Sequence, residues 1–325
     1  MKLVWVIGGS GLLGSALRAA CKAEGVALYT VPTALRWHDE SALFPALAVA
    51  VRGFVAAVAD DRPWQIYWAA GIGTMASQAA ELEPEARALS HLLSLLAAEA
   101  VLTDAARGVI GFASSAGAIY AASTDTIISE RSAVAPNTAY AHAKLAQESL
   151  LQQFSARYPA VGVAISRITT LYGPGQDMGK RQGLIAHIAR SVLRNKPIQI
   201  YVPFDTIRDY ITSTDVAQTM LARASVLQDS IFFSHDVENY LIHIVAAEQP
   251  ITIAEIIATF RRIARRAPLV VTSASPLSKF YLRRVQFRSV DPVESFRPRT
   301  SLLVGISQVM EAERHLYARG GAASR

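Results

Sequence analysis

The chain has 325 residues, of which 51% are hydrophobic and 18% are charged. This balance excludes a disordered chain and indicates a globular protein, built as one large α/β domain or two closely joined ones. The formal net charge is +6, with 26 arginines and 6 lysines. No lysine-rich run occurs, and the arginines of 261–268 fit the solvated face of a helix, so we do not expect nucleic-acid binding.

The sequence also favours a reducing compartment. Its single cysteine, Cys21, cannot form an internal disulfide. Residues 1–2 lead directly into an apolar strand and a glycine turn, which does not resemble a signal peptide. The most membrane-like stretch, 42–59, is interrupted by Pro45 and Arg52, so we predict a buried helix there. We therefore expect a cytoplasmic protein that does not associate with a membrane.

Strands and helices alternate along the first half of the chain. The predicted strands are apolar runs, and the predicted helices carry apolar residues at helical spacing. In chain order we predict strand 3–7, a helix ending near Gly25, strand 26–31, helix 40–60, strand 64–71, helix 78–106, strand 108–115, helix 138–157 and strand 161–173. This alternation predicts an α/β fold with a doubly wound parallel sheet of the Rossmann type.

The pattern changes after about residue 174. The remaining predicted elements are a helix in 180–196, a strand at 198–202, and helices at 213–226 and 252–266. These short, mixed elements predict a smaller α/β cap, and the tail 318–325 is expected to fray.

A glycine-rich turn, "GGSGLLG", follows the first strand and opens the first helix. Gly8 would permit a tight turn with positive φ, Gly11 a close approach of a pyrophosphate, and Gly14 close packing of helix and strand. The helix N-terminus offers aligned N–H groups to the phosphate charge. The turn, which also includes Ser10, Leu12 and Leu13, therefore predicts a dinucleotide site.

Tyr140 stands four residues before Lys144, and no other Tyr-x-x-x-Lys pair occurs in the chain. On a helix beginning after 136–138 the two side chains share one face. An unperturbed tyrosine has a pKa of about 10, and a neighbouring ammonium lowers that pKa by favouring the phenolate. We predict that Tyr140 is a general acid/base and that Lys144 is its partner, which also holds the cofactor ribose.

Together these segments resemble the extended short-chain dehydrogenase/reductase superfamily, and within it the NAD-dependent epimerase/dehydratase family. The resemblance runs from residue 3 to about 220. Its motifs are the glycine turn, "WAAG" (68–71), "FASSAGAIY" (112–120), "YAHAK" (140–144), "LYGPGQ" (171–176) and "IRDYITSTDVA" (207–217). It implies NAD or NADP as cofactor, a nucleotide-sugar-like substrate, and a homodimer formed by the helices after "WAAG" and around Tyr140.

The resemblance also implies domain limits and further site residues. The dinucleotide-binding domain would comprise 1–173 and 206–236, and the substrate-binding cap 174–205 and 237–325. Ser115, or else Ser114, would hydrogen-bond the substrate oxygen. Ala70 and Gly71 would lie beside the cofactor, with Tyr172 near the nicotinamide. Arg208 would hold the substrate diphosphate. The second arginine would be Arg288, or else Arg283, Arg284 or Arg297.

Three departures from the family pattern refine these expectations. No acidic residue ends the second strand, and Arg36 could face a 2′-phosphate, which favours NADP. Arg167 is followed three residues later by Thr170 instead of asparagine, so the usual contact to substrate is in doubt. No Asp-Glu pair follows Ser115, so an epimerase or a reductase is favoured over a dehydratase.

Two further functions are compatible with the same motifs. One is a reductase of another small carbonyl compound on the same scaffold, and the other is a dinucleotide-sensing protein without turnover. The intact Tyr140 and Lys144 argue against the sensor. The histidines show no ligand spacing with one another, so no metal site is expected; they include His38, His91, His142 and His187.

Overall fold

The computed structural model describes residues 2–58, 62–104, 108–176, 183–233, 238–273, 284–290 and 299–322. The chain forms two compact units. The first comprises 1–119, 136–167 and 217–243, and the second 120–135, 168–216 and 244–325. These limits differ from the predicted ones. Segment 120–135 and the strand after 206 belong to the second unit, and 237–243 belongs to the first.

The first unit contains a six-stranded parallel sheet with the order β2-β1-β3-β4-β5-β9, which confirms the predicted Rossmann-type fold. Its strands are β1 (Leu3–Ile7), β2 (Ala27–Leu28), β3 (Trp64–Trp68), β4 (Gly108–Ser115), β5 (Val161–Ile168) and β9 (Tyr240–Val245). The chain leaves β1 toward β2 and then returns to β3 on the other side. The carboxyl ends of β1 and β3 therefore flank the topological switch point, where sheets of this kind bind ligands.

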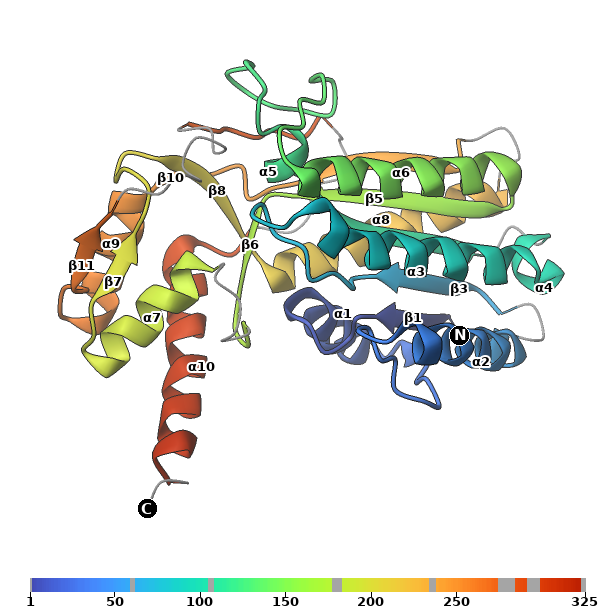
Figure 1. Ribbon diagram of the computed structural model, residues 1–325, viewed down its shortest axis with the longest axis horizontal. Coiled ribbons are helices and arrows are strands. Elements are labelled where there is room, and N and C mark those ends of the chain that lie inside the picture. Colours follow the sequence, from blue (N-terminus) through green and yellow to red (C-terminus); the bar gives the residue numbers. More distant parts are fainter. Residues whose placement is uncertain are drawn as a thin grey trace. The chain divides into compact units, whose positions relative to one another are not determined.

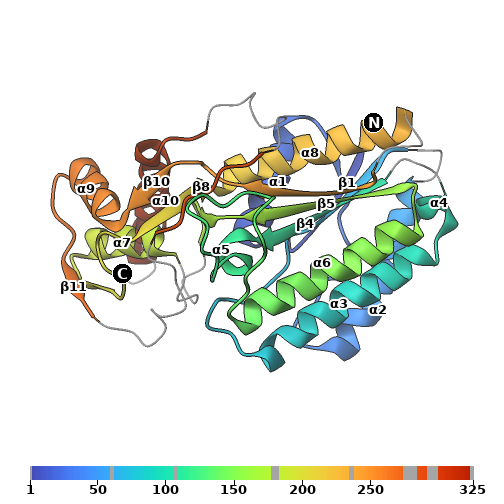
Figure 2. The same ribbon diagram turned by 90° about the horizontal axis from the view of Figure 1, so that it is seen from above.

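Helices cover both faces of this sheet (Figure 2). Helices α2 (Glu40–Val58), α3 (Ala79–Ala97) and α6 (Ala139–Arg157) lie side by side on one face. Helices α1 (Leu12–Ala23) and α8 (Ser213–Phe233) lie on the other, where Gln65 of β3 bonds Gln228 of α8. Two short helices, α4 (Ala100–Thr103) and α5 (Ala116–Ile119), flank β4.

Helix α2 is part of the sheet's core. Its Leu47, Val51 and Phe54 are buried in one cluster with Trp5 and Trp64 of the strands. By length and composition alone, α2 is the one helix of the described residues that could cross a bilayer. One face of this helix packs against the sheet, and 39% of the apolar stretch is buried.

The second unit is mixed α/β and is labelled in Figure 1. Its β8 (Ile207–Thr212) lies between β6 (Thr170–Tyr172), which is parallel to it, and β10 (Pro250–Thr252), which is antiparallel. A separate parallel pair is formed by β7 (Ile198–Ile200) and β11 (Val270–Thr272). Its helices are α7 (Leu184–Arg194), α9 (Ile253–Ala264) and α10 (Leu302–Ala322).

Helix α10 was not predicted, and it completes the core of the second unit. Its Ile306 and Met310 are buried with Ile188 of α7 and Phe260 of α9. A buried ion pair of 2.8 Å between Arg190 and Glu313 joins α7 to α10. The tail 318–325 was expected to fray, but the helix continues to Ala322, beyond which the residues lie outside the described part.

Candidate active site

The glycine turn forms a cradle of backbone groups after β1. Gly8 has φ of +84°, in the left-handed region that glycine adopts without strain. The Gly11 N–H donates to the Gly8 carbonyl at 3.0 Å and closes the turn. Gly11 is the N-cap of α1, and no side chain makes a capping bond there. The first N–H groups of α1 are therefore available to an anion such as a pyrophosphate.

Backbone segments pass so closely here that side chains are excluded. A Cβ atom on Gly8 would lie 2.5 Å from the backbone nitrogen of Ala70, at the end of β3. A Cβ atom on Gly14 would lie 2.1 Å from the Gly8 carbonyl oxygen. Ala70 is buried and Gly71 is exposed, so the ends of β1 and β3 meet through their backbones alone. This geometry fits a dinucleotide at the switch point.

The close packing around Gly14 allows a direct test. We expect Gly14→Ala to weaken dinucleotide binding by about tenfold or more, because the methyl group must push the turn away from α1. Gly117→Ala is the matched control: Gly117 lies outside the turn, and a Cβ atom there would have no neighbouring atom within 4 Å. Calorimetric titration of both variants with NADH and NADPH measures the effect. Equal affinities would contradict the assigned role of Gly14.

The other predicted residues of the turn, Ser10, Leu12 and Leu13, differ in their exposure to solvent. Ser10 is exposed and Leu12 is half-buried at the start of α1, whereas Leu13 is buried in the core. Leu13 can therefore contribute its backbone N–H to a ligand, but not its side chain.

The structure brings Ser115, Tyr140 and Lys144 together. Helix α6 begins after Thr138, whose hydroxyl accepts from the Ala141 N–H at 3.2 Å, and this cap places Tyr140 in the first turn. The Ser115 side chain lies close enough to Tyr140 to lower the pKa of its phenol. The Lys144 ammonium is buried, 5.8 Å from the centroid of the Tyr140 ring.

The neighbouring serine has a different partner. The Ser114 hydroxyl donates to the Glu148 carboxylate at 2.5 Å, and Arg167 bonds the same carboxylate through two nitrogens. All three side chains are buried. Ser115 is thus the serine that reaches Tyr140, and Arg167 belongs to a structural cluster inside the first unit.

A carboxylate that sequence analysis did not single out completes the cluster. Glu85 of α3 accepts from the Lys144 ammonium at 2.8 Å and from the Gln147 amide at 3.1 Å. A signal was present in the sequence: Glu85 follows Leu82 and precedes Leu89 at the spacing of the apolar face of α3. A charged residue on a face that packs against a sheet needs a buried partner.

The electrostatics differ from what the Tyr-Lys pair alone predicts. Burial raises the pKa of Tyr140, Lys144 lowers it, Glu85 raises it, and Ser115 lowers it; the net pKa lies above the ordinary value. Lys144 thus lowers the pKa of Tyr140 as expected, but burial, the largest influence, outweighs it. Burial works to lower the pKa of Lys144, but Glu85, Tyr140 and Glu148 outweigh it, and that pKa is raised.

The predicted substrate arginines lie in the second unit. Arg208 is on the central strand β8, half-buried, and its guanidinium donates to the Ile207 carbonyl at 2.8 Å. The backbone N–H of Arg288 donates to the Ile128 carbonyl at 2.9 Å, and its side chain is exposed. Arg284 pairs with Ile207 through a parallel bridge. Arg283 and Arg297 lie outside the described residues.

Segment 284–290 presents Arg284 and Arg288 on the same side, because Val285 and Phe287 are buried between them. Glu130 fixes the end of this segment by accepting from the Ser289 hydroxyl at 2.6 Å and from the Val290 N–H at 2.8 Å. Both exposed arginines of the segment therefore remain candidates for the second anion contact.

Tyr172 and Arg36, both predicted to touch the cofactor, differ in burial: Tyr172 is buried and Arg36 is exposed. Tyr172 is 2% exposed in the core of the second unit, and a Cβ atom on Gly305 of α10 would lie 2.0 Å from its hydroxyl oxygen. This placement does not fit the predicted contact with a nicotinamide. Arg36 is exposed, and the next residue, Trp37, packs edge-on against Trp68 with ring centroids 5.8 Å apart.

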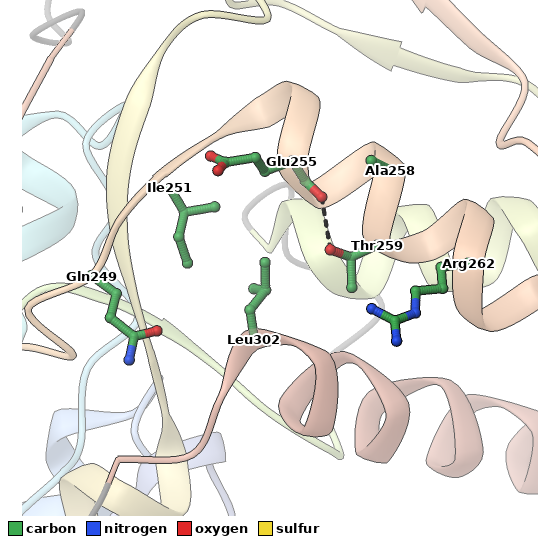
Figure 3. Close-up of a pocket in the computed structure, with 7 residues that line it drawn as sticks. All are labelled: Gln249, Ile251, Glu255, Ala258, Thr259, Arg262 and Leu302. Carbon is green, nitrogen blue, oxygen red and sulfur yellow. Dashed lines mark hydrogen bonds between the residues drawn. The ribbon is translucent and has the colours of Figure 1, made fainter.

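A shallow groove of about 390 Å³ lies elsewhere in the second unit (Figure 3). It contains none of the predicted site residues. Its lining comes from α9, from β10 and the residue before it, and from the start of α10: Gln249, Ile251, Glu255, Ala258, Thr259, Arg262 and Leu302.

The chain is similar to proteins of known activity. A dTDP-4-dehydro-6-deoxyglucose reductase from Escherichia coli is 32% identical over 110 residues, which are 34% of each chain. The chain thus spans about a third or less of the length of the curated relatives it matches.

Solved structures share the fold at low identity. MoeE5 in complex with UDP-glucose and NAD is 19% identical, with a TM-score of 0.76, over 98% of this chain and 100% of that one. RMD from Pseudomonas aeruginosa, complexed with NADPH, is 20% identical, with a TM-score of 0.75, over 96% and 97%. The family model described as the NAD dependent epimerase/dehydratase family matches residues 4–229, and the chain belongs to this family.

Proposed function

We propose that the protein is an NAD- or NADP-dependent epimerase or reductase that acts at a carbon of a nucleotide sugar. The observation that carries this proposal is the cluster of Ser115, Tyr140 and Lys144 in the same compact unit as the glycine cradle. A sensor would need only the cradle, whereas a hydride-transfer enzyme also needs an acid/base pair beside it.

The chain's own residues would manage the proton. When bound, a nicotinamide accepts a hydride from a sugar carbon or supplies one. Tyr140 takes the hydroxyl proton as that carbon is oxidised, or gives it back as the carbonyl is reduced. The Ser115 hydroxyl, near the Tyr140 phenol, would bond the sugar oxygen. Lys144 stabilises the phenolate form by its charge.

The proposed substrate class rests on the second unit and on the relatives. Arg208 and Arg288 supply guanidinium groups, which bind diphosphate oxygens in pairs. The Escherichia coli relative is named for a dTDP-sugar, and the MoeE5 structure contains UDP-glucose. The loop after Ser115 continues as helix α5, with Ala116 and Gly117 in place of acidic residues, which disfavours a dehydratase.

Between the two cofactors, we propose that the protein prefers NADP to NAD. No carboxylate follows the short strand β2 to receive the ribose hydroxyls, and the exposed Arg36 could pair with a 2′-phosphate. The fold relative RMD is complexed with NADPH, whereas MoeE5 holds NAD. A lower Kd for NADPH than for NADH, lost in Arg36→Ala, would support this choice.

We also propose a cytoplasmic homodimer, which binds neither membranes nor nucleic acid. The proposal of a dimer rests on the family resemblance. The leucines of α3 that suggested an apolar interface are packed in the core, and the exposed positions beside them include Ser90 and Ser94. Light scattering decides the question, since a single 35.0 kDa species would contradict a dimer.

The function is tested with the purified chain, NADH or NADPH, and a panel of nucleotide sugars and their keto derivatives. We expect a change in nicotinamide absorbance or an epimerised product with a nucleotide sugar, and much less with the same sugar lacking its diphosphate. Turnover of other small carbonyls alone would favour a reductase of a different substrate class. Dinucleotide binding without any turnover would overturn the proposal in favour of a sensor.

A further inference from the structure

We propose that Glu85 is a positioning residue that holds the Lys144 ammonium and sets the pH range in which Tyr140 exchanges its proton. The inference deepens the proposed function and rests on it, because it assigns a role beside the same acid/base pair. It concerns a residue of α3, a different element from the helix that carries Tyr140 and Lys144.

The geometry places the Glu85 carboxylate between Lys144 of α6 and the backbone of Gly71. One of its oxygens is 2.8 Å from the Lys144 ammonium, and both side chains are almost completely buried. A Cβ atom on Gly71 would lie 3.1 Å and 3.2 Å from the two Glu85 oxygens. The carboxylate therefore lies against the backbone at the end of β3, at the edge of the switch point.

Glu85 fixes where the lysine donors point. An ammonium has three N–H donors, and the bond to Glu85 uses one of them at a defined position. The Lys144 ammonium nitrogen lies over the Phe112 ring, 5.0 Å from its centroid. The remaining donors can serve the phenolate or a ribose hydroxyl, and the side chain loses little further rotamer freedom when it does so.

The charge of Glu85 also opposes the charge of Lys144 at the phenol. Among the described residues, the charged and titratable groups around Lys144 are Glu85 from α3, and Tyr140 and Glu148 from α6. Glu148 is already bonded to Arg167 of β5. Glu85 is thus the carboxylate that most directly offsets the ammonium, and it raises the pKa of Tyr140 where Lys144 lowers it.

This arrangement predicts the sign of the effect of a charge-removing substitution. Glu85→Gln keeps an oxygen that can accept from Lys144 but removes the negative charge. The limb of the pH–rate profile that is governed by Tyr140 should then move to lower pH by about one pH unit. A residue with a merely structural role would change kcat at every pH and leave the position of the limb unchanged.

The experiment compares the wild-type chain with Glu85→Gln, Glu85→Asp and Glu83→Gln across the pH range, at saturating dinucleotide. Glu83 is on the same helix but exposed, where it pairs with Arg87, and its variant controls for a change of net charge. We expect the shift in Glu85→Gln, a smaller one in Glu85→Asp, which retains the charge, and none in Glu83→Gln. Superimposable profiles for all four proteins would overturn the inference.

A second measurement does not depend on turnover. NMR of isotope-labelled tyrosine, assigned by comparison with Tyr140→Phe, follows the ionisation of Tyr140 directly. The Tyr140 signal should titrate at lower pH in Glu85→Gln than in the wild type. If no substrate is found, this titration still tests the role of Glu85, so failure of the inference and failure of the proposed function can be told apart. An unchanged titration of Tyr140 in Glu85→Gln would refute the proposed role of Glu85.

Discussion

Tyr140→Phe should lower turnover of a nucleotide sugar by roughly 10²–10⁴-fold, the usual contribution of a positioned acid/base group. The substitution removes only the hydroxyl that exchanges the proton with the sugar oxygen. The ring itself stays in place, because it is packed so closely that a Cβ atom on Gly73 would lie 2.9 Å from its Cδ2 atom. The structural effect should therefore be small, and the loss should appear in kcat.

The measurement combines steady-state kinetics with calorimetric titration of the dinucleotide. Dinucleotide affinity should change by no more than a few-fold, because the cradle at Gly8–Gly14 is untouched. Tyr158→Phe is the control: Tyr158 caps the other end of α6 and packs against Phe154, with ring centroids 4.9 Å apart. Turnover of Tyr140→Phe within a few-fold of the wild type would remove Tyr140 from the mechanism.

The parallel sheet could be predicted because each of its strands is a short apolar run between helical segments. The sixth strand, β9, was missed, and its sequence was assigned to the cap. Its run "YLIHIV" follows the long helix α8, as a strand does at the end of a strand–helix–strand crossover. Periodicity shows that a strand exists, but its place in a particular sheet depends on contacts distant in sequence.

Helix α10 was missed for a different reason. Its inward residues recur at helical spacing, with Ile306, Val309, Met310 and Glu313 all buried. Glu313 interrupts the apolar pattern, because it is satisfied by Arg190 of α7, 123 positions earlier in the chain. A charged residue that is buried in an ion pair weakens the apolar periodicity from which a helix is predicted.

The residues of the candidate site could be predicted where a backbone rule or a fixed spacing links them. The glycine turn obeys steric rules, and Tyr140 and Lys144 share a face because they are four residues apart on one helix. Glu85 could not be paired with Lys144 in this way, because the two are 59 positions apart and meet only when α3 packs against α6. For Tyr172, the prediction relied on its position after a strand, whereas packing against Gly305 decides its surroundings.

Arg167 provides the largest expected effect on stability. The threonine at 170, in place of the family's asparagine, put the usual substrate contact in doubt. The structure pairs Arg167 with Glu148 at 2.7 Å, with both side chains over 90% buried. Arg167→Met should lower the free energy of unfolding by about 3–5 kcal/mol, because the Glu148 carboxylate is left in the interior without the guanidinium that compensates its charge. Chemical denaturation followed by circular dichroism measures the change.

The double variant Arg167→Met, Glu148→Met separates loss of the pair from loss of packing. Replacing both partners by apolar residues removes the uncompensated charge, so most of the lost stability should return. Arg87→Met is the surface control: Arg87 pairs with Glu40 at 2.7 Å, but half of its side chain is exposed, and water and salt screen such pairs, so its loss should be far smaller. Two outcomes would contradict this role: Arg167→Met could be no less stable than Arg87→Met, or the double variant could be less stable than the single one. Either result would mean that the cluster of Ser114, Glu148 and Arg167 does not join β4, β5 and α6 beneath the catalytic residues.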